Sequence, residues 1–257
     1  MEYQCLQLEL REQVACVFLN RPAVLNALNE VLVAELAAVT DQISQDDRIR
    51  AVVIAGNGGN FAAGADISKM VDLAPLEARN FSFKDVFNKI ADLDKPVVAA
   101  MAGYALGAGL ELALVCDLRI AEEGARFGLP EINIGIMPGA GGTQRLPRLI
   151  GEAHAREMIY LGQTIDVQTA LGYGLINRIV SAGRLLDEAM EIAAKLAARP
   201  PIALRMAKRV MNYGMNCDVK TGIEFEAIAW ADLFSTEDQK EGMKAFLAKR
   251  KPGFKGR

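Results

Sequence analysis

The sequence contains a single histidine, His154, among its 257 residues. A catalytic Ser-His-Asp or Cys-His arrangement would have to use that one imidazole, and a metal site with two or more histidine ligands is excluded. His154 stands in the segment GEAHAR at 151–156, whose mixed charge is typical of a helix surface. A surface or packing role is therefore favoured for His154, and a serine peptidase is disfavoured.

Cysteine is also scarce, and no two cysteines form a Cys-x-x-Cys pair. The four are Cys5, Cys16, Cys116 and Cys217. A chain of this length needs no disulfide framework, so we expect reduced thiols in a cytoplasmic protein, with Cys116 as a core thiol. The first twenty residues carry acidic side chains and lack the basic-then-apolar order of a secretory signal.

Basic residues are not in excess, since 29 Lys and Arg stand against 32 Asp and Glu, giving a net charge of -3. A protein that neutralises phosphate backbones should be basic, so nucleic acid is not the expected partner. The basic run at 249–251 leaves an RNA-binding role as an alternative, which a salt-dependent RNA shift would support.

Long apolar runs are rare, and the one at 97–116 has the length of a membrane span with only one charged residue, Glu111. Pro96 before it and Gly103, Gly107 and Gly109 within it instead predict a buried strand, a glycine turn and a buried helix. We therefore expect no membrane association. A buried carboxylate is costly unless it is paired or used, so Glu111 becomes a candidate functional residue.

Strands and helices alternate along residues 1–180, which predicts a largely parallel α/β core, and only helices are expected in 181–257. Alternating leucines predict a hairpin over 6–19, and Asn29 is placed to cap the helix that follows. Further strands are expected at 51–55, 97–101, 118–121 and 126–127. The last helix is expected to begin near 235–238, and the tail KPGFKGR to be loosely held.

Two glycine-rich segments, GAG at 107–109 and GAGG at 139–142, lack the endings of a P-loop or a dinucleotide fingerprint. Tight turns are the more typical use of such segments. Each segment leads into a predicted helix, whose first N–H groups are free to meet a developing oxyanion.

Glu131 follows a proline in the segment GLPEI at 128–132, and taken alone it is typical of a solvated loop. If Glu131 faces Glu111, however, the two carboxylates can hold a water molecule, take one proton and return another.

Several ordered motifs resemble those of the enoyl-CoA hydratase/isomerase (crotonase) family, from about residue 14 to the tail. They include LNRP at 19–22, NALN at 26–29, FAAGAD at 61–66, GYALGAGLE at 103–111, FGLPE at 127–131 and GIMPGAGGTQRL at 135–146.

The resemblance implies an α/β fold, a crotonase-like spiral of ββα units with a C-terminal helical trimerisation region, assembled as a homotrimer or homohexamer. It implies an acyl-CoA thioester substrate whose enolate-like intermediate is met by two backbone N–H groups, those of Ala65 and Ala108. Alanine is acceptable at position 108 if its φ is negative. The remaining residues that the resemblance assigns to substrate and CoA binding are Ala63, Asp66, Ile67, Ser68 and Gly107.

Hydratases of this family carry two glutamates, and both are present here as Glu111 and Glu131. The resemblance therefore implies a hydro-lyase that adds water syn and reversibly to a trans-2-enoyl-CoA, giving a 3-hydroxyacyl-CoA. Glu111 takes a proton from the water and Glu131 delivers one to C2. No metal or other cofactor is required, since coenzyme A is part of the substrate.

Within the family, the sequence most resembles bacterial hydratases of short-chain and aromatic-catabolic pathways, including the 2,3-dehydroadipyl-CoA hydratase type. The acyl pocket is expected along residues 67–85, where Lys69, Arg79 and Lys84 are candidates to hold a distal carboxylate. An enoyl-CoA isomerase of the same fold is the alternative, because it would move a proton without adding water.

Overall fold

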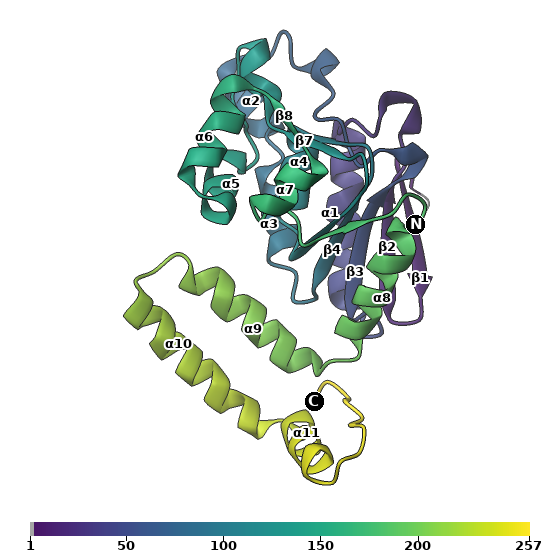
Figure 1. The fold of residues 1–257 in the computed structure, drawn as a ribbon, viewed down its shortest axis with the longest axis vertical. Coiled ribbons are helices and arrows are strands. Elements are labelled where there is room, and N and C mark those ends of the chain that lie inside the picture. Colours follow the sequence, from purple (N-terminus) through teal and green to yellow (C-terminus); the bar gives the residue numbers. More distant parts are fainter. Residues whose placement is uncertain (1–2) are drawn as a thin grey trace.

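The computed structural model describes residues 3–257, which form two sheets surrounded by helices (Figure 1). The strands are β1 (Leu6–Arg11), β2 (Val14–Leu19), β3 (Ala51–Gly56), β4 (Val97–Met101), β5 (Tyr104–Leu106), β6 (Leu118–Glu122), β7 (Arg126–Gly128), β8 (Thr164–Asp166) and β9 (Arg178–Val180).

The larger sheet has the strand order β1-β2-β3-β4-β6-β9. β1 and β2 form the predicted antiparallel hairpin, with Leu6 opposite Leu19, and each remaining neighbour pair in this sheet is parallel. The expectation of a largely parallel α/β core is therefore confirmed. Parallel strands are normally covered on both faces, which explains why their sequences are almost continuously apolar.

Alternate side chains of each strand serve the two faces of this sheet. Val52 and Ile54 of β3 join the cluster that includes Leu36 of the first helix, whereas Val53 packs with Ala193 of α8 (Leu185–Ala197) on the opposite face. The sheet is thus the middle layer between two groups of helices.

The helices are α1 (Glu30–Gln45), α2 (Pro75–Phe81), α3 (Lys84–Ala91), α4 (Ala108–Leu114), α5 (Gly142–Ile150), α6 (Glu152–Leu161), α7 (Val167–Gly172), α8 (Leu185–Ala197), α9 (Pro201–Gly214), α10 (Val219–Asp232) and α11 (Glu237–Leu247). Short 3-10 helices are η1 (Pro22–Val24), η2 (Asn57–Gly59), η3 (Ile67–Lys69), η4 (Pro130–Ile134) and η5 (Leu233–Ser235). Asn29 caps α1 as predicted, because its side chain accepts a hydrogen bond from the N–H of Leu32.

A smaller sheet, β5-β7-β8, creates the platform for the site. β4, β5 and α4 follow one another, and β6, β7 and α5 do so with η4 between β7 and α5. Successive strand-strand-helix units therefore place one strand in each sheet. The predicted succession of ββα units is confirmed. β5 pairs in parallel with β7, which brings the segment before α4 beside the segment before η4.

After α8 the chain leaves the layered core (Figure 1). α9 and α10 run side by side as an arm, and α11 follows α10 at the end of the arm where α9 begins. α8 itself packs on the large sheet through Ala189, Ala193 and Ala197. The division at residue 180 stays a prediction of domain organisation, while the visible departure from the core occurs at Pro200.

The tail is held in place, so the expectation of a loose end is wrong. The carboxylate of Asp238 accepts hydrogen bonds from the N–H groups of Lys255 and Gly256, and the carbonyl of Phe254 accepts one from Arg50. Asp238 is buried, and such a carboxylate needs partners, which the tail amides provide.

The apolar run at 97–116 folds as β4, β5 and α4, close to the predicted strand, turn and helix. Among residues 3–257, no helix combines the length and apolarity that crossing a membrane would require.

Candidate active site

Glu111 lies in α4, a helix whose seven residues are all buried, and its side chain is 2% exposed. One oxygen, Oε1, accepts hydrogen bonds from the N–H groups of Ala140 and Gly142, at 2.8 and 2.7 Å. The glycine-rich segment 139–142 is thus a clamp for this carboxylate. The sequence predicts a turn or a general anion site for this segment, and no pattern in it indicates a contact with Glu111.

Glu131 lies on η4, directly after Pro130, and is half-buried. Its Oε2 is buried without a hydrogen-bond partner among the described residues. Oε1 points toward the start of α4, since a Cβ atom placed on Gly107 would lie 3.1 Å from it. The structure therefore brings Glu131 to the start of the helix that carries Glu111.

The two carboxyl groups differ in what offsets their burial. Burial, with a smaller contribution from the nearby negative charge of Glu111, raises the pKa of Glu131 to about 7, although the backbone N–H of Glu131 itself opposes part of this rise. Burial also raises the pKa of Glu111, but the N–H groups of Gly142 and Ala140 and the positive charge of Arg145 oppose that rise. Hydrogen bonds to an ionised carboxylate favour the charged form, so Glu111 is suited to be a base and Glu131 an acid at neutral pH.

Gly107 joins β5 to α4 with φ of +50° and ψ of −128°, a conformation that favours glycine. Its N–H donates to the carbonyl of Gly128, which fixes the turn against β7. The added Cβ on Gly107 would also lie 3.6 Å from the Cα of Gly64. The two predicted oxyanion segments, 63–66 and 107–109, therefore approach each other closely.

Ala65 and Ala108 are the predicted donors, and neither N–H makes a hydrogen bond within residues 3–257. The N–H of Leu28 donates to the carbonyl of Gly64, and the carbonyl of Leu28 accepts from the N–H of Asp66. The N–H of Ala65, between these two residues, therefore points away from Leu28. Ala108 is the first residue of α4, where N–H groups lack an intrahelical partner. The condition on its backbone is met, because Ala108 is not among the residues with positive φ.

The loop that follows Ala65 is shaped by its own polar residues. The carboxylate of Asp66 accepts from the hydroxyl of Ser68 at 2.7 Å and from Arg21 at 3.2 Å. The hydrogen bond from Ser68 and the guanidinium of Arg21 lower the pKa of Asp66. Ala63 is half-buried, whereas Ile67 and Ser68 are exposed at the start of η3. These residues line an accessible edge beside Ala65.

Asn26 holds together the backbone segments next to this loop. In the sequence it stands out only as part of the motif NALN at 26–29. It is fully buried and has a positive φ of 57°. Its side chain accepts from the N–H of Arg21 and donates to the carbonyls of Asn57 and Asn60. The only signal in the sequence is an asparagine between two apolar segments, which does not reveal these long-range partners.

The candidates for a distal carboxylate lie on the exposed segment 67–85. Lys84 is already paired with Asp85 at 2.8 Å. Lys69 ends η3, and Arg79 lies in the last turn of α2.

His154 and Cys116 have the packing roles that the sequence predicts for them. His154 stacks on Tyr173 with ring centroids 3.6 Å apart, and Cys116 is a buried thiol whose pKa is raised by burial to about 12. Trp230 is 63% exposed on α10 and packs edge-on against Phe234.

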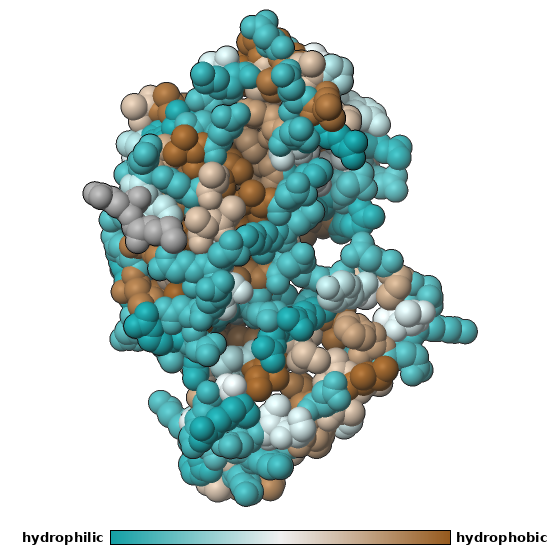
Figure 2. Space-filling view, turned by 180° about the vertical axis from the view of Figure 1, so that it is seen from behind, coloured by the Kyte–Doolittle hydropathy of each residue, from teal (hydrophilic) through white to brown (hydrophobic). Residues whose placement is uncertain are grey.

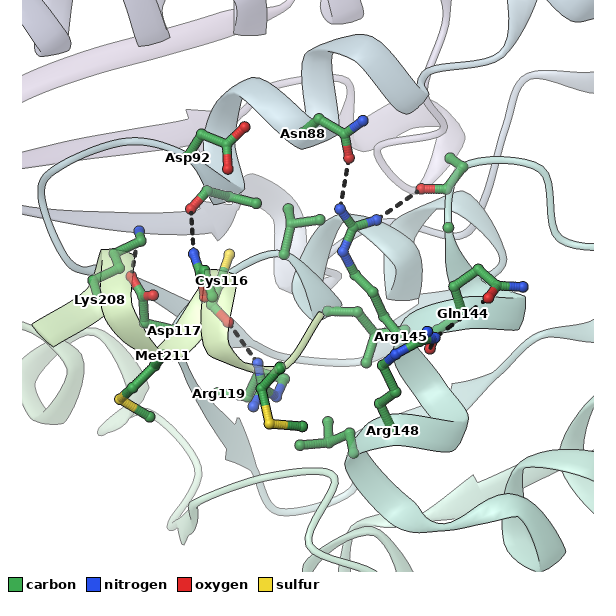
Figure 3. Close-up of a pocket in the computed structure, with 18 of the residues that line it drawn as sticks. Asn88, Asp92, Cys116, Asp117, Arg119, Gln144, Arg145, Arg148, Lys208 and Met211 are labelled. Carbon is green, nitrogen blue, oxygen red and sulfur yellow. Dashed lines mark hydrogen bonds and ion pairs between the residues drawn. The ribbon is translucent and has the colours of Figure 1, made fainter. Parts of the chain in front are cut away.

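A hollow of about 1090 Å³ lies between the core and α9, and neither glutamate is among the residues that line it (Figure 3). It runs along the reverse side of the 139–142 segment and is lined by Arg145, Arg148, Lys208 and Met211, among others. Lys208 of α9 crosses to the core beside this hollow and forms an ion pair with Asp117 at 2.8 Å.

The chain matches the family described as enoyl-CoA hydratase/isomerase over residues 9–257. It is 45% identical to the short-chain-enoyl-CoA hydratase of Clostridium acetobutylicum, with both chains covered completely. It is 42% identical to the 2,3-dehydroadipyl-CoA hydratase of Escherichia coli, covering 96% of this chain and 97% of that protein. The crystal structure of an enoyl-CoA hydratase subunit from Geobacillus kaustophilus superposes with a TM-score of 0.96 at 41% identity, over the full length of both chains.

Proposed function

The chain belongs to the enoyl-CoA hydratase/isomerase family, and we infer that it is an enoyl-CoA hydratase, a lyase that adds water reversibly to a trans-2-enoyl-CoA. The observation that carries this inference is the pair of glutamates beside two N–H groups, those of Ala65 and Ala108. Glu111 is clamped by two amides, whereas within residues 3–257 one oxygen of Glu131 and both N–H groups have no hydrogen-bond partner. An isomerase needs to move only one proton, whereas this arrangement provides both a base and an acid.

In the proposed reaction, the thioester carbonyl oxygen accepts hydrogen bonds from the N–H groups of Ala65 and Ala108. Glu111 removes a proton from water as the water oxygen bonds to C3, and the electrons of the double bond move toward the thioester oxygen. The two N–H groups stabilise that developing enolate. Glu131 then donates a proton to C2, which gives the 3-hydroxyacyl-CoA by syn addition. Proton exchange with solvent restores the two carboxyl groups.

The loop of residues 63–68 is proposed to run along the CoA portion of the substrate. Ala63, Ile67 and Ser68 offer its accessible edge, and Asp66 stays bound to Arg21 as a brace. Gly107 leaves room for the thioester between the two segments. This chemistry needs no metal or redox cofactor, because two carboxyl groups and two amides perform every step.

Short 2-enoyl chains, such as the crotonyl group, are the proposed substrate class. The relative with 45% identity is named for short-chain substrates, and the 2,3-dehydroadipyl-CoA hydratase is almost as similar. A distal carboxylate would require a free cation, and Lys84 already has an acidic neighbour. Lys69 and Arg79 remain the candidates if the longer dicarboxylic chain is accepted.

A homotrimer or homohexamer is the proposed assembly. α9 buries no residue of its own and α10 buries only Ala229, although both carry large apolar side chains. Figure 2 shows brown and tan patches over the lobe formed by the arm. Exposed apolar surface of this extent marks an interface, and light scattering at micromolar concentration should give a trimer or hexamer, not a monomer. The four free thiols support a cytoplasmic location.

A panel of CoA esters tests the function directly. Wild-type enzyme should remove the absorbance of the enoyl-thioester band with crotonyl-CoA and form 3-hydroxybutyryl-CoA, including after exhaustive EDTA treatment. Longer enoyl-CoAs and 2,3-dehydroadipyl-CoA in the same panel define chain-length preference. Double-bond migration without a hydroxylated product would favour the isomerase, and salt-dependent RNA binding without hydration would favour an RNA-binding protein.

A further inference from the structure

Glu111 depends on a segment that has little to hold it in shape. The clamp at 139–142 consists of three glycines and one alanine, and Gly141 has a φ of +114°. α5 begins at Gly142 without a side-chain cap. Glycine-rich backbone loses much entropy when it is ordered, so an external brace is needed if both amides are to point at one carboxylate oxygen.

Arg145 supplies contacts to this segment from the first turn of α5. Its Nη1 donates to the carbonyl of Ala140 at 3.4 Å, and its Nη2 donates to Oδ1 of Asn88 at 2.7 Å. Its guanidinium lies against Gly141, where any side chain would collide with it. Figure 3 shows Arg145 extending across the hollow to Asn88 on α3.

Ala140 is therefore held from both sides, because its N–H donates to Glu111 and its carbonyl accepts from Arg145. A second bond ties the same segment to the region before α3, since the hydroxyl of Ser82 donates to the carbonyl of Gly139 at 2.8 Å. The connections form one chain from α3 through Arg145 and the clamp to Glu111.

We propose that Arg145 is a positioning residue for Glu111, acting by bracing the 139–142 clamp against Asn88 of α3. The inference rests on the proposed role of Glu111 as the base. The half-buried guanidinium of Arg145 also interacts favourably with the negative charges of Glu111 and Asp92, so a neutral replacement loses both the brace and this favourable charge. A lysine retains the charge but lacks the planar fork that reaches two acceptors.

The consequence is a loss of turnover with little change in binding. A catalytic group displaced by about 1 Å can lose ~100-fold in rate, so Arg145→Met should lower kcat by about 10- to 100-fold. KM for crotonyl-CoA should change by less than about threefold, because Arg145 does not contact the predicted CoA loop. Arg145→Lys should recover only part of the loss.

Arg148 offers a matched control. It lies one turn further along α5, lines the same hollow and is exposed, and it donates only to Gln144. Arg148→Met should keep kcat within about twofold of wild type, because nothing connects it with Glu111.

A double-mutant cycle between Arg145→Met and Glu111→Gln tests the proposal, with circular dichroism and oligomer size as controls for folding. If Arg145 acts through Glu111, Arg145→Met should lower the residual rate of the Glu111→Gln enzyme by less than about threefold. Equal losses in both backgrounds, or a near-wild-type kcat for Arg145→Met, would overturn the proposal. If Arg145→Met does not fold, Asn88→Ala replaces it in the cycle, with an expected loss of about 3- to 10-fold that disappears in the Glu111→Gln background.

The same measurements separate this inference from the proposed function. A Glu111→Gln enzyme with near-wild-type hydration would contradict the role of Glu111 itself, and the positioning role would fall with it. A nearly inactive Glu111→Gln enzyme together with an unaffected Arg145→Met enzyme would contradict only the positioning role.

Discussion

All seven residues of α4 are buried, whereas η4, five residues long, contains no fully buried residue. Each segment contributes one glutamate to the same site. Glu111 on α4 is surrounded by apolar core and receives two amide hydrogen bonds, while Glu131 on η4 is half-buried and leaves Oε2 unpartnered. Under the proposed mechanism, identical side chains are thereby given different tasks by their backbones.

The difference shows how one residue type can serve as base and acid together. Amide donors favour the ionised form of Glu111, whereas burial favours the protonated form of Glu131. A rigid helix also suits the residue that must aim a water molecule. The more exposed 3-10 helix suits the residue that must regain a proton from solvent after each turnover.

The largest expected effect comes from removing each carboxyl group in turn. Glu111→Gln and Glu131→Gln retain size and hydrogen-bonding capacity but lose acid-base function, so each should lower kcat by roughly 10²–10⁴. The double variant should lose far less than the product of the two, because both groups act on one water addition. Steady-state hydration of crotonyl-CoA measures this, and near-wild-type turnover by either single variant would contradict the assignment.

Two substitutions at Ala108 distinguish the role of its backbone N–H from the role of its side chain. Ala108→Gly should be mild, whereas Ala108→Pro removes the N–H proposed to meet the thioester oxygen and should lower kcat by about 10²–10³. Proline is tolerated in the first turn of a helix, so the fold should survive. Circular dichroism and oligomer size are the controls. Equal activity of the two folded variants would exclude residue 108 as a donor.

The pH dependence of hydration should identify Glu131. Its pKa of about 7 means that the protonated acid is lost as the pH rises above neutrality. In wild type, kcat/KM should therefore fall by about tenfold per pH unit above pH 7 to 8. The residual activity of Glu131→Gln should lack this alkaline decline. A wild-type profile that stays flat to pH 9 would rule out Glu131 as the acid.

The smallest effect concerns stability. Because the pKa of Glu131 is raised from 4.5 to about 7 on folding, the folded state keeps a proton that the unfolded state has released between these values. Stability is therefore lost as the pH rises through that window. Glu131→Gln should be more stable than wild type at pH 8, by about 2–4 °C in Tm, and the gap should narrow toward pH 5. Thermal unfolding at the two pH values checks the sign.

Much of the core could be predicted because its signals are local. Alternating leucines defined the hairpin of β1 and β2, Asn29 marked the start of α1, and Thr236 caps α11 where the sequence placed the last helix. The isolated charge at Glu111 stood out within an apolar run. Its burial in a helix followed from that pattern.

The unpredicted features depend on partners that are distant in the sequence. β5 and β8 are three-residue strands that exist because β7 lies between them. The clamp on Glu111 joins α4 to a segment about thirty residues later, and the tail is fixed by Asp238 rather than by its own composition. Single-residue patterns do not encode such pairings.

The contrast between the two carboxyl groups can be measured without substrate. Infrared difference spectroscopy during a pH titration follows the stretch of protonated carboxyl groups, and Glu131→Gln and Glu111→Gln identify the contribution of each. The band lost in Glu131→Gln should titrate with a midpoint near pH 7, and the band lost in Glu111→Gln should titrate at lower pH. A midpoint for Glu131 below that for Glu111 would contradict the division into base and acid.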